Sequence, residues 1–288
     1  DQNRQPAERA EQNQQLLAIA KQARQLALEM DFAFLLAPDR DLLSIGYALE
    51  TNQLDESCYD LLASEARLAS LFAIAKGDAS SKHWFRLGRS ATPLYRASVL
   101  LSWSGSMFEY LMPSLVMRAP AGSVLDQTTR LIVARQRAYA AALGIPWGIS
   151  ESSYNARDLQ MTYQYSNFGV PGLGLKRGLS ENRVIAPYAT GLAAMIDPVA
   201  AVNNYAELAS LGAEGRYGFY EAVDFTPSRM PADESRAIVR SFMAHHQGMT
   251  ITAIANTLQN GRLRDLFHAE PMIQGAELLL QERIPRDV

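Results

Sequence analysis

Cysteine is almost absent from this sequence, because Cys58 is the single one among 288 residues. An internal disulfide is therefore excluded, and a chain without disulfides is typical of a reducing compartment. We interpret Cys58 itself as a small apolar residue buried on a helix. No apolar run reaches the length of a membrane span, so we expect no direct membrane insertion by this segment.

An excess of positive charge is also missing. The formal net charge is -3, which argues against a nucleic-acid partner, because such a partner requires a basic face. No signal peptide is visible, and the sequence starts at Asp1 without an initiator methionine, so we expect a piece of a longer polypeptide. The balance of 48% hydrophobic and 20% charged residues is that of an ordinary globular protein with one large or two small domains.

Several motifs that carry known chemistry are lacking. There is no His-Glu-x-x-His motif and no cysteine cluster, so we predict no metal site. The glycine-rich run 169–178 fits neither the phosphate-binding loop spacing nor a dinucleotide turn; we predict no cofactor and interpret the run as a substrate-side loop. The Gly-x-Ser-x-Gly elbow of serine hydrolases is absent as well.

Helical periodicity dominates what is present. Capped or amphipathic stretches predict helices over 6–30, 55–76, 124–143, 197–211, 233–258 and 275–283. One small β-hairpin is predicted over 32–47. Strands and helices do not alternate, which excludes a parallel sheet. We therefore predict an all-α protein, a toroid of helical hairpins whose loops gather at one end of the ring.

Two stretches seventy positions apart repeat one pattern: helix end, loop, aromatic residue, glycine, two residues, glutamate. The first is Trp147-Gly148-Ile149-Ser150-Glu151 and the second is Tyr217-Gly218-Phe219-Tyr220-Glu221. Glycine after the aromatic residue permits a backbone that other residues avoid. Two equivalent loops could then direct both carboxylates into one cavity, the minimal equipment for cleaving a glycosidic bond. We predict Glu151 and Glu221 as the catalytic pair.

Plainer explanations of these carboxylates stay open. Glu151 could complement a helix dipole, and Glu221 could form a salt bridge to Arg216 or Arg229. Glu109 is a third candidate and is interpreted as helix-borne support. Asp158 and Asp224 could orient sugar hydroxyls.

Aromatic and polar side chains near the two loops are candidates for sugar binding, because sugars present both apolar faces and hydroxyls. The candidates are Trp103, Glu109, Trp147, Tyr154, Asp158, Tyr165, Tyr217, Tyr220, Asp224, His246 and Gln247. We expect Trp103, Trp147, Tyr165, Tyr217 and His246 to line one cavity with both glutamates. The alternative is that the aromatic residues pack the loops and that His246 only makes buried hydrogen bonds.

Specific strings distributed over nearly the whole chain carry a family resemblance. They include Ser102-Trp103-Ser104-Gly105, Phe108-Glu109-Tyr110-Leu111-Met112-Pro113, Trp147-Gly148-Ile149-Ser150-Glu151-Ser152-Ser153-Tyr154-Asn155-Ala156-Arg157-Asp158, Gly215-Arg216-Tyr217-Gly218-Phe219-Tyr220-Glu221-Ala222 and Met243-Ala244-His245-His246-Gln247-Gly248-Met249. With them the chain resembles the glucoamylase-like cyclization domain of bacterial cyclic β-1,2-glucan synthases.

The resemblance implies an (α/α)6 toroid that transfers a β-1,2-glucan chain onto its own far end by retaining transglycosylation. A complete toroid has more helices than the sequence shows, so either the fragment omits some or our reading merges several. Residues 1–30 would be a linking helix and 31–288 the catalytic toroid. The parents are large inner-membrane proteins, and this segment would be a cytoplasm-facing module whose partners are the glucan chain and the remaining domains. A β-1,2-glucan hydrolase and a non-catalytic glucan-binding module are the alternatives.

Overall fold

The computed structural model describes residues 4–231 and 233–283, and it is mostly helical with short strands between the helices. The all-α prediction is confirmed. The helices are α1 Arg4–Glu29, α2 Arg67–Lys76, α3 Ser81–Arg86, α4 Met107–Leu111, α5 Val124–Leu143, α6 Pro187–Ala193, α7 Pro198–Ser210, α8 Ala244–Leu258, α9 Arg262–His268 and α10 Pro271–Ala276.

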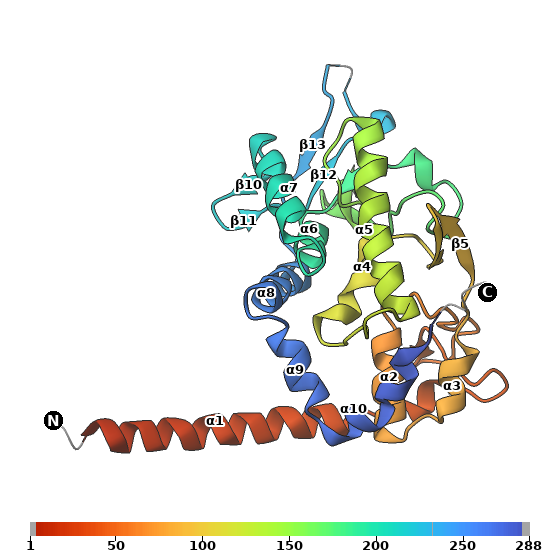
Figure 1. Ribbon diagram of the computed structural model, residues 1–288. Helices are drawn as coiled ribbons and strands as arrows, with labels where there is room; N and C mark the ends of the chain where they lie inside the picture. The colour runs from red at the N-terminus through yellow and green to blue at the C-terminus, as the bar shows by residue number, and fades with distance from the viewer. Residues whose placement is uncertain (1–3, 232, 284–288) are drawn as a thin grey trace.

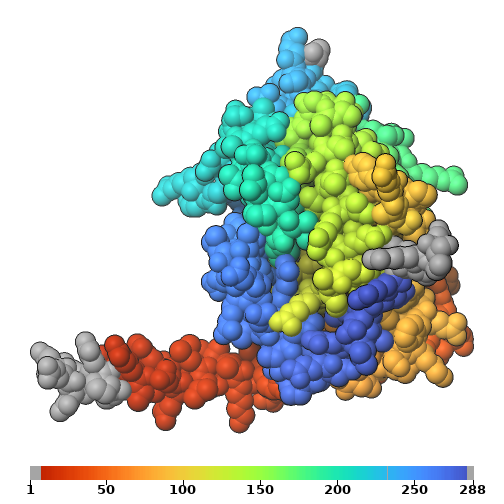
Figure 2. All heavy atoms as spheres, viewed as in Figure 1, coloured from red at the N-terminus to blue at the C-terminus, as the bar shows by residue number. Residues whose placement is uncertain are grey.

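Helix α1 projects from the body, whereas the other helices pack around one core (Figures 1 and 2). Its leucines Leu16, Leu17 and Leu26 are exposed, so its apolar stripe covers nothing within the described residues. The body places α5 beside α4, and α6 between α4, α7 and α8 (Figure 1).

Helix α5 forms the centre of the core because its ends and its inner face are well specified. The Ser123 hydroxyl accepts the backbone N–H of Asp126 at 3.2 Å, and Gly144 ends the helix with φ 67°. Its buried face includes Ile132 and Val133, which belong to one continuous apolar cluster with residues of α4, α6 and α8. Burial of this face stabilises the helix.

The strands are short and antiparallel. They are β1 Leu36–Ala37, β2 Leu42–Leu43, β3 Tyr47–Ala48, β4 Gln53–Leu54, β5 Ala91–Leu94, β6 Ala97–Leu100, β7 Ser152–Arg157, β8 Tyr163–Ser166, β9 Val184–Ile185, β10 Glu214–Gly215, β11 Gly218–Phe219, β12 Ala222–Asp224 and β13 Ala237–Val239. The hairpin predicted over 32–47 is present as β1–β2, and the order β13–β12–β9 forms the largest sheet among the described residues.

Two predicted helices are wrong in part. Residues 55–66 are irregular and α2 begins at Arg67. Cys58 is half-buried and pairs with Ser44 in an isolated backbone β-bridge, instead of lying buried on a helix. The stretch predicted as one helix over 233–258 contains β13 and then α8, because 237–239 pair with β12. The helix predicted over 275–283 is present as the end of α10 and a short 3-10 helix, Glu277–Gln281. Helices α3, α6 and α9 were not predicted.

The glycine-rich run packs tightly against the stretch that carries Trp103. A Cβ on Gly169 would lie 1.8 Å from the carbonyl oxygen of Ser104, and one on Gly174 would lie 2.5 Å from the Ser104 carbonyl carbon. Only glycine permits this approach of two backbones. The run therefore fixes the position of residues 102–105.

Candidate active site

Two buried amide side chains hold the stretch that leads to Glu151. Gln136 of α5 accepts the Ile149 N–H at 3.0 Å and donates to the Ile149 carbonyl at 2.8 Å. Asn204 of α7 does the same for Trp147, at 3.1 and 2.9 Å. In both residues the backbone N–H and the backbone carbonyl are hydrogen-bonded, which leaves the backbone little freedom. The two amides therefore fix the backbone immediately before Glu151.

Glycine and hydroxyl groups complete this support. Gly148 has φ 118°, as expected for the glycine after the aromatic residue. The Tyr188 hydroxyl, from α6, donates to the Glu151 carbonyl at 2.9 Å and contacts Ser150 Oγ at 2.8 Å. Glu151 immediately precedes β7 and is not in the first turn of a helix, so the alternative that it complements the dipole of a helix that it begins is wrong.

The Glu151 side chain faces a cavity of about 710 Å³, a size typical of small-molecule sites. The cavity is lined by Arg40, Ile45, Glu56, Ser57, Cys58, Tyr59, Asp60, Leu61, Ser64, Glu65, Trp103, Glu109, Glu151 and Asn167. Trp103 is 56% exposed, so its ring is open to a ligand. Glu65 comes from the irregular segment before α2 and faces the same space.

Two of the acidic residues that line the cavity, Glu65 and Glu151, have a raised pKa. Burial raises the pKa of Glu151 most, the charges of Glu65 and Glu109 raise it further, and the hydrogen bond from Tyr165 and the charge of His246 lower it. Burial likewise raises the pKa of Glu65, and the Glu109 charge adds to this, against hydrogen bonds from its own backbone and from Ser64. Two carboxyl groups with raised pKa in one cleft are typical of acid–base chemistry.

Glu109 supports the site structurally. Its carboxylate accepts hydrogen bonds from the hydroxyls of Ser102 and Ser104, at 2.8 and 2.6 Å, and from the backbone N–H of Ser104 and Ser106. It also completes a capping box at the start of α4. With its oxygens occupied, Glu109 fixes the loop that carries Trp103.

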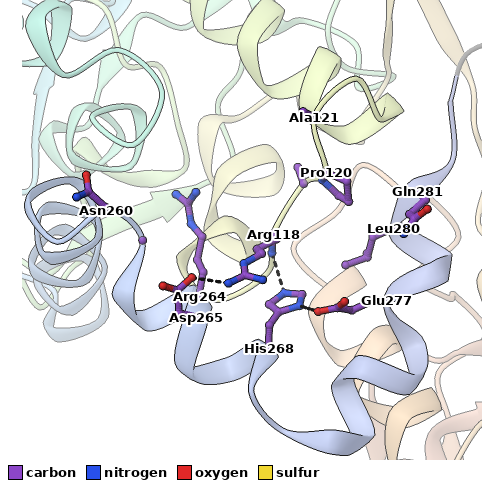
Figure 3. A pocket seen from close by; sticks show the side chains of 12 residues that line it. Arg118, Pro120, Ala121, Asn260, Arg264, Asp265, His268, Glu277, Leu280 and Gln281 are labelled. Atoms are coloured by element: carbon purple, nitrogen blue, oxygen red, sulfur yellow. Dashed lines mark hydrogen bonds and ion pairs between the residues drawn. The ribbon is translucent and has the colours of Figure 1, made fainter.

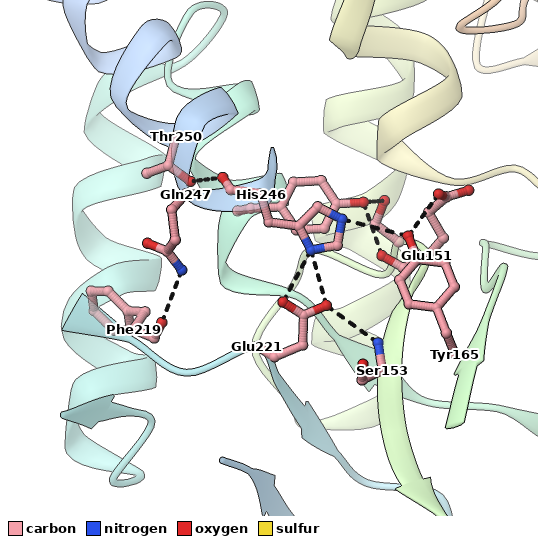
Figure 4. Close-up of polar contacts among 10 residues, drawn as sticks. Glu151, Ser153, Tyr165, Phe219, Glu221, His246, Gln247 and Thr250 are labelled. Atoms are coloured by element: carbon pink, nitrogen blue, oxygen red, sulfur yellow. Dashed lines mark hydrogen bonds and ion pairs between the residues drawn. The ribbon is translucent and has the colours of Figure 1, made fainter. Parts of the chain in front are cut away.

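Glu221 does not line this cavity, and its carboxylate lies against the His246 ring (Figure 4). It is 2% exposed, it accepts the Ser153 N–H at 3.2 Å, and it contacts His246 Nδ1 at 2.9 and 3.0 Å. Its partner is thus His246 and not the arginines considered from the sequence. A smaller cavity, of about 150 Å³, adjoins Glu221, His246, Gln247 and Tyr220.

A chain of contacts joins the two glutamates (Figure 4). The Tyr165 hydroxyl donates to Glu151 Oε1 at 2.8 Å and lies 3.5 Å from His246 Nε2. The His246 ring stacks on Tyr188 with centroids 3.8 Å apart. The repeated pattern therefore does bring both glutamates to one region, through Tyr165 and His246.

The prediction of one shared aromatic cavity is wrong. Of the five residues, only Trp103 lines the cavity with Glu151, whereas His246 lines the smaller cavity with Glu221. Trp147 is buried in the core and borders a groove between α5 and α7. Tyr217 is 73% exposed at the β10–β11 turn, beside Phe242. Proximity in sequence to a glutamate therefore does not place an aromatic side chain in its cavity.

The remaining candidates lie around β7. Tyr154 packs edge-on against Phe168 and under the Arg229 guanidinium. Asp158 is exposed in the β7–β8 turn and accepts the N–H groups of Gln160 and Thr162. Asp224 is buried, and Arg229 donates to it at 2.7 Å.

Glu65, Tyr59 and Tyr188 were missed from the sequence. Glu65 was assigned to the interior of a predicted helix, where a glutamate reads as solvated surface. Tyr188 lies in the string Ala186-Pro187-Tyr188, and no spacing signal connects it with Glu151. The proline that starts α6 directs Tyr188 toward the site.

A second polar cavity lies on the side of α9 and α10, with about 480 Å³ (Figure 3). Its charged side chains already have partners: Arg118 bonds Asp265, His268 bonds Glu277, and Arg264 donates to the Ser114 carbonyl. Nothing in it resembles two free carboxyl groups beside an aromatic ring. Across residues 4–231 and 233–283, no group of three histidine, cysteine or acidic side chains is arranged to hold a metal ion.

The fold and the site define a helical domain of the glucoamylase type with carboxyl groups and a tryptophan in its cavity. The chain belongs to the glycoamylase family, described as "Putative glucoamylase", whose profile matches residues 57–271. It is similar to the cyclic β-(1,2)-glucan synthase NdvB of Rhizobium meliloti (strain 1021), with 58% identity over 275 residues. That match covers 96% of this chain and 10% of the synthase, so the chain spans a tenth of its relative.

Solved structures share the fold. The endo-β-1,2-glucanase of Chitinophaga pinensis, solved with sophorotriose and glucose, has a TM-score of 0.66 at 17% identity; the match covers 92% of this chain and 64% of that one. The β-1,2-glucanase of Parabacteroides distasonis has a TM-score of 0.65 at 16% identity, with 92% and 41% covered. No helix among the described residues is long and apolar enough to cross a membrane.

Proposed function

We propose that this domain cleaves and religates β-1,2-glucan by retaining transglycosylation and closes linear chains into rings. The observation that carries the proposal is the pair Glu65 and Glu151, which face one cavity beside the exposed Trp103. The 58% sequence identity to a cyclic β-(1,2)-glucan synthase supports β-1,2-glucan as the substrate and a ring as the product.

The two carboxyl groups differ in surroundings, which supports different roles. Glu151 receives the Tyr165 hydroxyl and the influence of His246, both of which favour its ionised form. Glu65 has a raised pKa and receives a side-chain hydrogen bond from its neighbour Ser64, at 3.1 Å. We therefore assign Glu151 the role of the nucleophile and Glu65 that of the general acid.

The reaction then has two displacements. The Glu151 carboxylate attacks the anomeric carbon while Glu65 donates its proton to the departing glycosidic oxygen, which gives a glycosyl-enzyme. A hydroxyl at the far end of the same glucan attacks next, Glu65 takes its proton, and the ring is released. Trp103 covers the apolar face of a sugar and limits the access of water.

In this proposal Glu221 leaves the reacting pair predicted from the sequence, because its carboxylate lies against His246. The remaining domains of a larger synthase, at the cytoplasmic face of an inner membrane, would supply the linear chain. We expect no cofactor.

Product analysis tests the proposal. Linear β-1,2-glucan incubated with the domain should yield rings, whose mass lacks the water of a free reducing end. Glu151→Gln and Glu65→Gln should each lower the rate by about 10²–10⁴ or more, whereas Glu207→Gln on α7 should not.

Hydrolysis is the second candidate, favoured by the fold shared with two β-1,2-glucanases. If shortened linear chains were the only product, the domain would be a hydrolase and not a transglycosylase. Binding without any new product would show a glucan-binding module.

A further inference from the structure

The strongest unexplained feature is a buried histidine–carboxylate pair next to the proposed nucleophile. Glu221 and His246 have side chains that are both 1% exposed, and neither lines the large cavity. Burying an ionisable pair is costly unless its hydrogen bonds are satisfied. Here Glu221 accepts from Ser153 and His246, so the pair is held in one geometry.

The hydrogen-bond chemistry fixes the direction of the chain. A carboxylate only accepts, so His246 Nδ1 carries the proton that faces Glu221. In the neutral ring Nε2 is then an acceptor, and it faces the Tyr165 hydroxyl at 3.5 Å. Stacking on Tyr188 keeps the ring in this orientation.

Tyr165 has one proton and two neighbours that accept it. When Glu151 is ionised, the phenol donates to Glu151 Oε1 at 2.8 Å. When Glu151 is protonated, its O–H donates to the phenol oxygen and the phenol proton turns to His246 Nε2. Passing both protons along this line leaves Glu151 ionised, Tyr165 unchanged and His246 as an imidazolium beside Glu221. No proton is gained or lost.

We propose that Glu221 and His246 act through Tyr165 as a proton acceptor that keeps Glu151 ionised, which makes them positioning residues of the site. This inference rests on the proposed function, in which Glu151 is the nucleophile. The need for such an acceptor is specific to this cavity, because burial opposes ionisation of Glu151 most strongly and the Glu109 charge opposes it further. Tyr188 and Tyr165 are its other titratable neighbours, and His245 adjoins His246.

The direct test is the pKa of Glu151, measured from its ¹³C carboxyl resonance without any substrate and assigned with Glu151→Gln. Tyr165→Phe should raise that pKa by about 1 unit, since it removes the hydrogen bond and the connection to His246. Glu221→Gln keeps the shape but removes the charge, and it should shift the pKa in the same direction.

A double variant distinguishes action through Tyr165 from a general effect. Glu221→Gln should add nothing to Tyr165→Phe if the influence passes through the phenol, whereas independent effects would add. Tyr163→Phe on the same strand is the matched control, because its hydroxyl bonds Arg157 instead. An unchanged Glu151 pKa in both Tyr165→Phe and Glu221→Gln would overturn the proposal.

The pH profile of ring formation gives a second readout. In each variant the acidic limb should move to higher pH by the shift of the Glu151 pKa measured for that variant, whereas a merely structural role of Glu221 would lower the rate without moving the limb. If the parent domain makes no product from β-1,2-glucan, the proposed function fails, and the resonance titration still decides the proton-acceptor role. If Glu221→Gln does not fold, the comparison of Tyr165→Phe with Tyr163→Phe decides it.

Discussion

Trp103 is the most exposed aromatic residue in the cavity that contains Glu65 and Glu151. Its neighbours Ser102 and Ser104 are hydrogen-bonded to Glu109, so the backbone that carries the ring is fixed before a ligand arrives. A preorganised aromatic surface binds with a smaller entropy cost than a mobile one. The tryptophan is therefore a natural platform for a sugar ring.

Removing that platform should weaken binding more than catalysis. We expect Trp103→Ala to reduce affinity for linear β-1,2-glucan by about 1–2 kcal/mol, measured by calorimetry in the Glu151→Gln background, with Trp103→Phe retaining most of it. Equal affinity in the alanine variant and the parent would show that the ring contacts no sugar.

The position of Glu65 in the cavity could not be predicted from the sequence. The apolar positions around it fit a helix over 55–76, and the helix does exist from Arg67 onward. The segment before α2 is irregular, and its residues 56–61, 64 and 65 line the cavity. Such a path is decided by contacts distant in sequence, such as the bridge from Leu61 to Gly88. Glu151, in contrast, was identifiable because its loop carries a local glycine signal.

Among the elements, helix ends were more predictable than strand pairing. Gly77 and Gly144 take left-handed conformations at helix ends, as their positions after apolar stripes predict. Strand β13 was predicted as helix because three residues are too few to show the alternation of a strand. Its partner, β12, is distant in the sequence. Local chemistry specifies a helix end, whereas a short strand depends on its neighbour.

The glycine-rich run offers a test at the level of elements. Gly169→Ala should destabilise the fold by about 1–3 kcal/mol, because its Cβ would overlap the Ser104 carbonyl, which is backbone and cannot rotate away. Gly275→Ala in α10 meets nothing within 4 Å and should be neutral or stabilising by up to about 1 kcal/mol. Urea unfolding would measure both. Equal effects would mean that residues 102–105 yield to the added methyl group.

For the whole molecule, the cavity carboxyl groups should weaken the fold at neutral pH. The pKa values of Glu65 and Glu151 are raised in the folded state, so this state binds protons more tightly than the unfolded chain. Their favourable contribution is present below the ordinary glutamate value of about 4.3 and is lost as pH rises through the folded values.

The double variant Glu65→Gln/Glu151→Gln should therefore melt at a higher temperature than the parent at pH 7. The difference should shrink as the pH is lowered to about 4. Thermal unfolding followed by circular dichroism at both values checks this. A difference independent of pH, or a less stable variant, would show that the two carboxylates contribute to folding.

The amides of Gln136 and Asn204 have a consequence for cooperativity. They attach the peptides before Glu151 to α5 and α7, the helices that form the core. A site carried on a free loop can open by itself, with a small local free energy. Here the backbone of the proposed nucleophile belongs to the same cooperative unit as the core, so losing the site and losing the fold become one event.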